Sequence, residues 1–363
     1  MRPFSIVAVG IASATLLGVA SFWGGCSATQ SSTDGGSTSS AGTPPVRPSG
    51  PVTTNTTTHN YALRKLFLGD SQTWKGYGYN LDGKSTTSAS TDVCTRYADA
   101  PRNNQEDGTN GIDNSFGRNL METILSLRAS AQEDVNKALN DGTFTVMVVV
   151  SGWDQASAKF SATGLSTKLY TGGAFSDGGT KPTWTTADDW PVARSLLENP
   201  DDISSTKIKF ADSYANNGTY VSGNPGRVAL SLSFGGTLLD LNIEQAVMTM
   251  EVSGTSATNG RIAGVIETDK LVSALRTLGG RFATSLCTSS TFDSIEKTVR
   301  QASDMLSNGT NTAGQPCDAL SVGLSFEATE IGVPTTVAAQ GPVEADPCAD
   351  AGGGDAGTGD SGH

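Results

Sequence analysis

The chain has little positive charge, two histidines and no recognisable metal or nucleotide motif. Its 363 residues carry 24 Lys and Arg against 36 Asp and Glu, which gives a formal net charge of -12. A chain of this sign has no electrostatic footprint for nucleic acid and is repelled by anionic lipid surfaces. The sequence contains no Cys-x-x-Cys pair, no Cys/His cluster and no phosphate-binding loop, which argues against zinc and nucleotide sites. It also lacks heptad repeats and a second apolar run long enough to span a membrane.

The first 26 residues have the organisation of a bacterial export signal. Arg2 is the only charged residue there, residues 4–22 are apolar or small, and Gly24-Gly25 precede the first cysteine, Cys26. This end resembles a lipobox, in which the cysteine is acylated and becomes the first residue of the mature protein. A lipobox usually has Leu where this chain has Trp23. Ordinary secretion and an uncleaved membrane anchor are the alternatives.

The lipobox resemblance implies a location for the protein. Ser27 follows the cysteine, where Asp commonly retains lipoproteins at the inner membrane, and this favours the outer membrane. We therefore expect an exported protein with a lipoprotein signal peptide over residues 1–25. It would be lipid-anchored through Cys26 at the outer membrane or the cell surface.

Composition divides the rest of the chain into three parts. Residues 26–58 are almost entirely Ser, Thr, Gly, Pro, Asn and Ala, which predicts a disordered linker. The Gly- and Asp-rich residues 341–363 lack the apolar side chains needed for a core, which predicts a disordered tail. Between them, residues 59–340 are long enough to bury a sizeable core, as a β-rich globular domain.

The remaining cysteines predict disulfides. With Cys26 acylated, an even number is left for an oxidising compartment. They are Cys94, Cys287, Cys317 and Cys348. Cys287 and Cys317 flank one predicted helix and are the favoured pair among three possible pairings. Cys94 would then bind Cys348 and tie the start of the tail to the domain.

Strand patterns outnumber helix patterns in residues 59–340. Alternating apolar residues at 228–234 and 239–243 flank Gly235-Gly236, which predicts a hairpin with a tight turn. Further strands are expected at 247–252, 262–266 and 320–326. The nearly continuous apolar run 144–150 predicts a strand that is buried on both faces.

Three segments repeat apolar residues every three or four positions, which predicts helices at 116–139, 271–278 and 295–306. Thr268 is expected to cap the second helix and Gly279-Gly280 to end it. Strands predominate and do not alternate regularly with helices. The expected fold is therefore mainly β (α+β), an antiparallel β-sandwich or barrel-like body with about three packed helices.

The segment Gly69-Asp70-Ser71 resembles the first block of the SGNH or GDSL hydrolases, in which the serine is the nucleophile. That resemblance implies an esterase in which a histidine from a C-terminal Asp-x-x-His activates Ser71. The chain has only His59 and His363, and His363 lies in the Gly-rich tail. A strand that ends in a Gly-Asp-Ser turn is the simpler interpretation. No catalytic residue is assigned.

Closely spaced Asp, Asn and Gly residues form a candidate calcium site. Segment 107–114 could wrap oxygen ligands around Ca²⁺, and a second Asp-Gly step nearby could add another ligand. The candidate ligands are Asp82, Asp107, Asn110 and Asp113. The alternative is that these residues form turns, and that Asp113 or Ser115 caps the helix expected near Phe116.

Aromatic and acidic residues in loop-like sequence offer two weaker candidates. Sugars stack on exposed indole and phenol rings, although aromatic residues in β proteins are more often part of the core. The aromatic candidates are Trp74, Tyr77, Tyr79, Trp153, Trp184 and Trp190. The acid pairs Asp188-Asp189 and Asp201-Asp202 could suggest a glycosidase, but solvated loops explain them better.

Residues 61–69, 77–84 and 110–117 are similar to a group of myxobacterial-type lipoproteins with no assigned function, and residues 282–317 are similar as well. The resemblance implies an exported, anchored protein and transfers no functional residue. The anchor, the linker, the β-rich body and the lack of a complete catalytic set lead us to expect a lipid-anchored cell-envelope protein that binds a glycan or another envelope component. Its membrane contact would be the lipid on Cys26, and calcium is the cofactor to test. A surface hydrolase and a structural spacer without ligand are the alternatives.

Overall fold

The computed structural model describes residues 42–176, 180–234, 237–288, 290–339 and 345–349. The described residues all belong to one compact unit, Ser37–His363. The predicted signal peptide, Cys26, the Gly235-Gly236 turn and most of the predicted tail lie outside the described residues.

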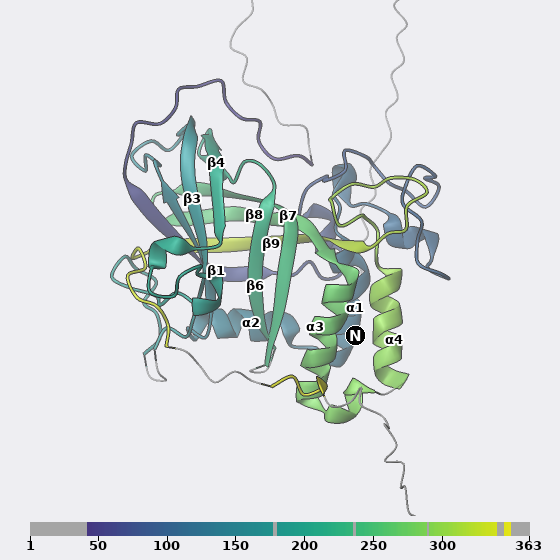
Figure 1. Ribbon diagram of the computed structural model, residues 1–363. Helices are drawn as coiled ribbons and strands as arrows, with labels where there is room; N and C mark the ends of the chain where they lie inside the picture. Colours follow the sequence, from purple (N-terminus) through teal and green to yellow (C-terminus); the bar gives the residue numbers. More distant parts are fainter. Residues whose placement is uncertain (1–41, 177–179, 235–236, 289, 340–344, 350–363) are drawn as a thin grey trace, which may run out of the picture. The chain divides into compact units, whose positions relative to one another are not determined.

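Nine strands in the described residues form one sheet, in the order β5-β4-β3-β2-β1-β9-β8-β7-β6 (Figure 1). Their bounds are β1 Thr58–Phe67, β2 Thr145–Ser151, β3 Ala162–Gly172, β4 Ile208–Asn216, β5 Thr219–Val221, β6 Gly226–Phe234, β7 Thr237–Ser253, β8 Ser256–Glu267 and β9 Ala319–Ile331. Every pairing between these strands is antiparallel. The expected mainly antiparallel β fold with packed helices is confirmed.

The sheet closes on itself through its shortest strand. β5 pairs with β4 on one side, where Tyr214 faces Val221, and with β7 on the other, where Val221 faces Thr249. All strands except β6 therefore form a closed ring, and β6 extends β7 as a hairpin. The barrel-like alternative describes this arrangement better than the sandwich, because a sandwich would leave two separate sheets.

Strand β2 shows how sequence pattern and burial agree. Val146, Val148 and Val150 point into the main core with the interior residues of the other ring strands. Met147 and Val149 point to the other face, where Trp190 and neighbouring residues cover them in a second cluster. The apolar run 144–150 is therefore a strand that is buried on both faces, as expected.

The expected helix over 116–139 is divided into three pieces. A π-helix, Phe116–Leu120, leads into α1, Met121–Leu127, and a separate helix α2 follows at Ala131–Asn140. Arg128 ends α1 in an extended conformation, with φ -145° and ψ 90°. The apolar spacing runs through this break because both helices pack on the same core, so the pattern alone could not reveal it.

Helix α3, Thr268–Phe282, and helix α4, Ser290–Gln301, follow β8. Two details of the prediction are wrong. Glu267, and not Thr268, occupies the N-cap position, and the Thr268 hydroxyl instead bonds the Ser303 hydroxyl at 2.6 Å. The helix also continues through Gly279-Gly280, because tertiary packing there outweighs the weak helix propensity of glycine. No helix in the described residues is long and apolar enough to cross a membrane.

Short helical turns complete the connections. They are η1 Thr73–Gly76, η2 Arg102–Gln105, η3 Thr109–Gly111, η5 Arg194–Leu196, η6 Ile203–Ser205 and η7 Thr284–Cys287.

The cysteines pair differently from the prediction. Cys94 bonds Cys317 and Cys287 bonds Cys348, across 223 and 61 residues respectively. The favoured Cys287–Cys317 pair is wrong because tertiary packing places each of these cysteines beside a different partner. A bridge between Thr95 and Pro316 brings the first pair together, and the second pair fixes the start of the tail.

Part of the segment predicted to be a disordered linker is ordered, and its residues 26–41 lie outside the described residues. Residues 42–57, here called the strap, lie against the ring and make defined contacts. Arg47 binds the Asp212 carboxylate at 2.7 Å and stacks on Tyr214, whose hydroxyl donates to the Pro45 carbonyl. The Ser, Thr and Asn content that suggested disorder here supplies hydrogen bonds to the sheet and its loops, as when Asn55 donates to the Trp153 carbonyl.

Candidate functional site

Two long loops meet where β1 ends and β9 begins. The first runs from the end of β1 through residues 68–87, and the second covers residues 101–116. Gly108 N donates to Ile112 O and Asp113 N donates to Tyr79 O, so the second loop folds back on itself and against the first. All four residues of the predicted calcium site lie in this loop region.

Asn114 holds the two loops to the sheet. Its buried amide donates to the Trp74, Tyr77 and Gly323 carbonyls at 3.1, 3.2 and 2.9 Å. Its Oδ1 accepts from the Gly117 and Gly323 amides, both at 3.0 Å. The bond from Gly117 fulfils the role expected of Asp113 or Ser115, because it caps the first helical turn. Sequence reasoning missed Asn114, since its role depends on partners more than 200 residues away.

Gly323 is the matching feature of the sheet. A Cβ atom at this position would lie 2.1 Å from the Tyr77 carbonyl oxygen. Only glycine therefore lets the first loop approach β9 closely enough for Asn114 to bond both.

The structure brings three of the four predicted calcium ligands together. Asp113 is 2% exposed and its Oδ2 accepts from Leu81 N at 2.6 Å. Asp107 hydrogen-bonds Asp113 and accepts from Thr86 N. Asp82 accepts from Lys84 N at 2.7 Å, while its other oxygen is buried without a hydrogen-bond partner in the described residues. These three residues are called the acidic cluster below.

Burial and mutual repulsion raise the pKa values of Asp107 and Asp113 in the acidic cluster. Burial, followed by the charge of Asp82, raises the pKa of Asp113 well above its ordinary value. The pKa of Asp107 rises to about 7, chiefly through burial and through the charges of Asp82 and Asp304. Asp304 was not a sequence candidate, and burial raises its pKa to about 7 as well. Burial and the neighbouring charges therefore favour the protonated form of both Asp107 and Asp113.

The arrangement supports the turn interpretation of these acids more directly than the metal interpretation. Each of the three carboxylates accepts a backbone N–H of a neighbouring turn. Across the described part of the chain, no group of three or more His, Cys, Asp or Glu side chains is placed to hold a metal ion. Asn110 is exposed in a left-handed turn, with φ 60°, and its side chain makes no bond to the acidic cluster. Calcium binding stays a prediction.

A polar pocket of about 380 Å³ opens beside the same loops and is called the loop pocket. Its lining residues are Ser71, Gln72, Trp74, Lys75, Asn103, Glu106, Arg118, Asn119 and Glu122. The Arg118 guanidinium pairs with Glu106 at 2.7 Å and lies 5.1 Å from the centre of the Trp74 ring. Its hydrogen bond holds the pKa of Glu106 below the ordinary value.

The loop pocket offers polar groups that have no partner yet. The side chains of Ser71, Gln72 and Asn103 are exposed and make no hydrogen bond to other described residues. A hydroxyl and two amides together provide donors and acceptors. Lys75 and Glu122 add one charge of each sign, so the pocket lining has no net charge.

The aromatic candidates are mostly part of the core. Trp74, Tyr79, Trp153 and Trp190 are between 0% and 5% exposed, which excludes them as a face on which sugars stack. Trp184 is partly buried and packs on Trp190, with ring centres 5.5 Å apart. The core interpretation of these residues is therefore confirmed. The acid pairs hold turns, since Asp188 accepts from Trp184 N and Asp202 from Ser204 N.

Ser71 and His59 lie at opposite ends of β1. Ser71 follows the C-terminal end in a left-handed conformation, with φ 49°, and Thr73 N closes the turn on the Asp70 carbonyl. His59 is near the N-terminal end, and a strand of this length separates the two by about 25 Å. The simpler interpretation, a strand followed by a Gly-Asp-Ser turn, is confirmed. The described residues do not assemble the triad that the hydrolase resemblance implies.

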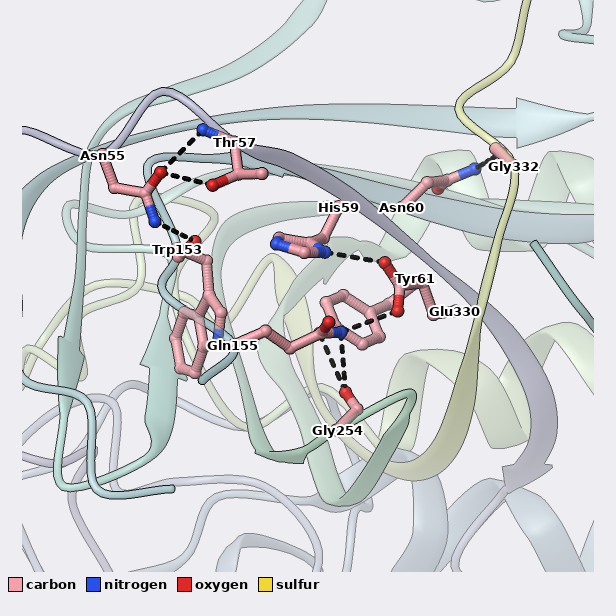
Figure 2. Close-up of polar contacts among 10 residues, drawn as sticks. All are labelled: Asn55, Thr57, His59, Asn60, Tyr61, Trp153, Gln155, Gly254, Glu330 and Gly332. Carbon is pink, nitrogen blue, oxygen red and sulfur yellow. Dashed lines mark hydrogen bonds and ion pairs between the residues drawn. The ribbon is translucent and has the colours of Figure 1, made fainter. Parts of the chain in front are cut away.

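His59 belongs to a buried network at the other end of the ring, shown in Figure 2. Its Nδ1 lies 2.7 Å from Oε1 of Glu330 on β9, and Gln155 donates to the second Glu330 oxygen at 2.6 Å. Gln155 also bonds Tyr61 and the Gly254 carbonyl. Burial, with a further contribution from the Glu330 charge, raises the pKa of Tyr61. The network joins β1, β9, the loop after β2 and the β7–β8 turn.

Comparison with protein-family models, with curated proteins and with solved structures found no match for this chain.

Proposed function

We propose that this chain is an exported, lipid-anchored protein of the cell envelope that binds a glycan or another hydroxyl-rich envelope component in the loop pocket. The lipid on Cys26 is its contact with the outer membrane or cell surface. The globular domain, residues 59–340, is then a binding module without a nucleic acid partner.

The observation that carries the proposal is the loop pocket. A ligand rich in hydroxyl groups both donates and accepts hydrogen bonds, and the free Ser71, Gln72 and Asn103 side chains can do the same. The balanced charges of Lys75 and Glu122 suit a neutral ligand better than an anionic one.

The two disulfides support the exported location. Both join segments that are far apart in the sequence, and bonds of this kind persist in oxidising compartments. The acidic composition supports the absence of nucleic acid partners.

Metabolic labelling tests the anchor. Cells that express the native chain and the Cys26→Ser chain are fed a clickable fatty acid. We expect label on the native chain alone. Equal label on both chains would end the lipoprotein proposal and leave the pocket untouched.

Glycan binding is tested on the Cys26→Ser chain, produced with its own leader and purified after export. We expect selective binding on a broad glycan array, and a loss of about tenfold in affinity when Gln72→Ala and Asn103→Ala are combined. Gln315→Ala is the matched control, because Gln315 is also exposed and lies outside the pocket. If no glycan on the array binds, the alternative of a structural spacer without ligand is favoured.

A hydrolase is the second candidate, favoured by one observation. The Ser71 hydroxyl is free at the rim of the loop pocket, on a left-handed turn. Ester hydrolysis by the purified chain that disappears in Ser71→Ala, with an unchanged melting temperature, would replace the binding proposal with this one. His59 cannot act as the general base for Ser71, because the length of β1, about 25 Å, separates the two residues.

A further inference from the structure

An apolar groove lies between three helices and the β6–β7 hairpin, and it shares no lining residue with the loop pocket. It has a volume of about 280 Å³. Leu275, Leu278 and Gly279 of α3 form one wall, and Phe292 and Ile295 of α4 form another. The volume is just below the usual range for ligand sites, about 300–1,000 Å³, so a narrow unbranched chain suits it better than a ring system.

The rim of the groove is open to solvent and apolar. Phe282, at the end of α3, is 54% exposed and lines the groove. Large apolar side chains at such positions are typical of ligand-binding grooves and of lipid contacts.

One charged residue lines the groove, and its terminal Nη donors are unused although its charge is paired with Asp134. Arg128 ends α1 and its Nε donates to Asp134 at 2.6 Å. The side chain is 47% exposed, and its terminal Nη groups make no hydrogen bond to other described residues. A guanidinium in this state can still bind a carboxylate through two parallel hydrogen bonds.

We propose that this groove binds a free long-chain fatty acid, with the hydrocarbon chain along α3 and α4 and the carboxylate on Arg128. Charge complementarity favours this occupant over a neutral lipid, because the one cation of the lining stands next to an otherwise apolar surface. The site is independent of the loop pocket and of lipidation at Cys26.

Competition binding tests the proposal on the Cys26→Ser chain, purified after export. The fluorescent polyene cis-parinaric acid is the probe, and palmitic acid and methyl palmitate compete for it. We expect saturable binding at one site and about tenfold stronger competition by the acid than by the ester, the size of one charge-assisted interaction at a half-exposed site.

Gly279→Leu fills the groove without straining the fold. A Cβ there meets Leu286 at 3.6 Å, which is ordinary contact, and leucine favours a helix more than glycine does. We expect affinity for the probe to fall at least about tenfold. Gly76→Leu, at a position with open space around its Cβ, is the matched control and should bind as the parent does.

Arg128→Leu distinguishes binding of the hydrocarbon chain of the fatty acid from binding of its carboxylate. It should erase the preference for acid over ester while the ester binds as before, and Arg128→Lys should restore part of the preference. The absence of probe binding, or unchanged binding in Gly279→Leu, would overturn the proposal. Loss in Gly279→Leu with an unchanged acid preference in Arg128→Leu would also overturn it, because a group other than Arg128 would then bind the carboxylate.

Discussion

Asp304 gives the sharpest test of the electrostatics near the loops. The residue is 5% exposed, and its two oxygens accept from the Ser321 amide at 2.8 Å and the Ser321 hydroxyl at 2.5 Å. Burial raises its pKa from 3.8 to about 7. The folded protein therefore keeps Asp304 protonated at pH values at which the unfolded chain has already lost this proton.

The sign of the effect follows from this difference. Between pH 4 and pH 7 the folded protein binds more protons at this site than the unfolded chain, so stability falls as the pH rises. The contribution is complete at low pH and is lost as the pH rises through the folded pKa. The raised pKa corresponds to about 4 kcal/mol over that window.

Asp304→Asn removes the titration and keeps the hydrogen bonds. The amide oxygen can accept from the Ser321 amide, and the amide nitrogen can donate to the Ser321 hydroxyl, which also accepts. We expect the free energy of unfolding of the variant to fall less between pH 4 and pH 8 than that of the parent. The difference between the two profiles should be on the order of 4 kcal/mol.

Urea unfolding of both chains, with the disulfides intact, measures this difference at each pH. Asp318→Asn is the matched control, because Asp318 makes the same pair of bonds, to Ser307, on an exposed site. Its profile should run parallel to that of the parent. Parallel profiles for Asp304→Asn as well would refute the reasoning.

Three further predictions concern the loops and the disulfides. Asn114→Ala should lower the free energy of unfolding by about 3 to 5 kcal/mol in a urea titration, because it leaves several buried backbone groups unpaired. Asn114→Asp keeps the acceptor bonds but turns a carboxylate oxygen toward three buried carbonyl oxygens, so it should lose at least as much. Cys348→Ser should leave a reactive thiol at Cys287 and an intact Cys94–Cys317 peptide in a non-reducing digest, and a Cys287–Cys317 peptide would contradict this. Calcium at about 1 mM should leave the melting temperature equal to that in EDTA, because the three carboxylates already accept backbone N–H groups of turns, and a higher temperature with calcium would establish the metal site instead.

The sequence predicted best those elements whose side chains all lie in one kind of environment. Strand β2 is buried on both faces and its residues 146–150 are all apolar, so the sequence identifies it as a strand directly. Strands β3 and β4 were missed because polar residues point into the core. Thr167 and Ser213 are 1% and 0% exposed and share hydrogen bonds with Tyr220 there. Buried hydroxyl groups of this kind read as surface in a hydropathy pattern.

The candidate site was predictable only where the signal was local. Asp82, Asp107 and Asp113 lie in two Asp-Gly-rich loops and could be grouped from sequence. Asp304 could not, since it joins them through tertiary packing after α4. The cysteine pairing and the role of Asn114 failed for the same reason: both depend on contacts between distant segments.

The strap has a mechanical consequence for any force that pulls on the chain ahead of residue 42. Its side-chain bonds, such as those of Arg47 and Asn55, would break one after another, as in peeling. The load would then reach β1, which pairs with β2 on one side and β9 on the other (Figure 1). Pulling along that strand stresses both ladders at once, so the strap yields at low force while the closed ring behind it resists.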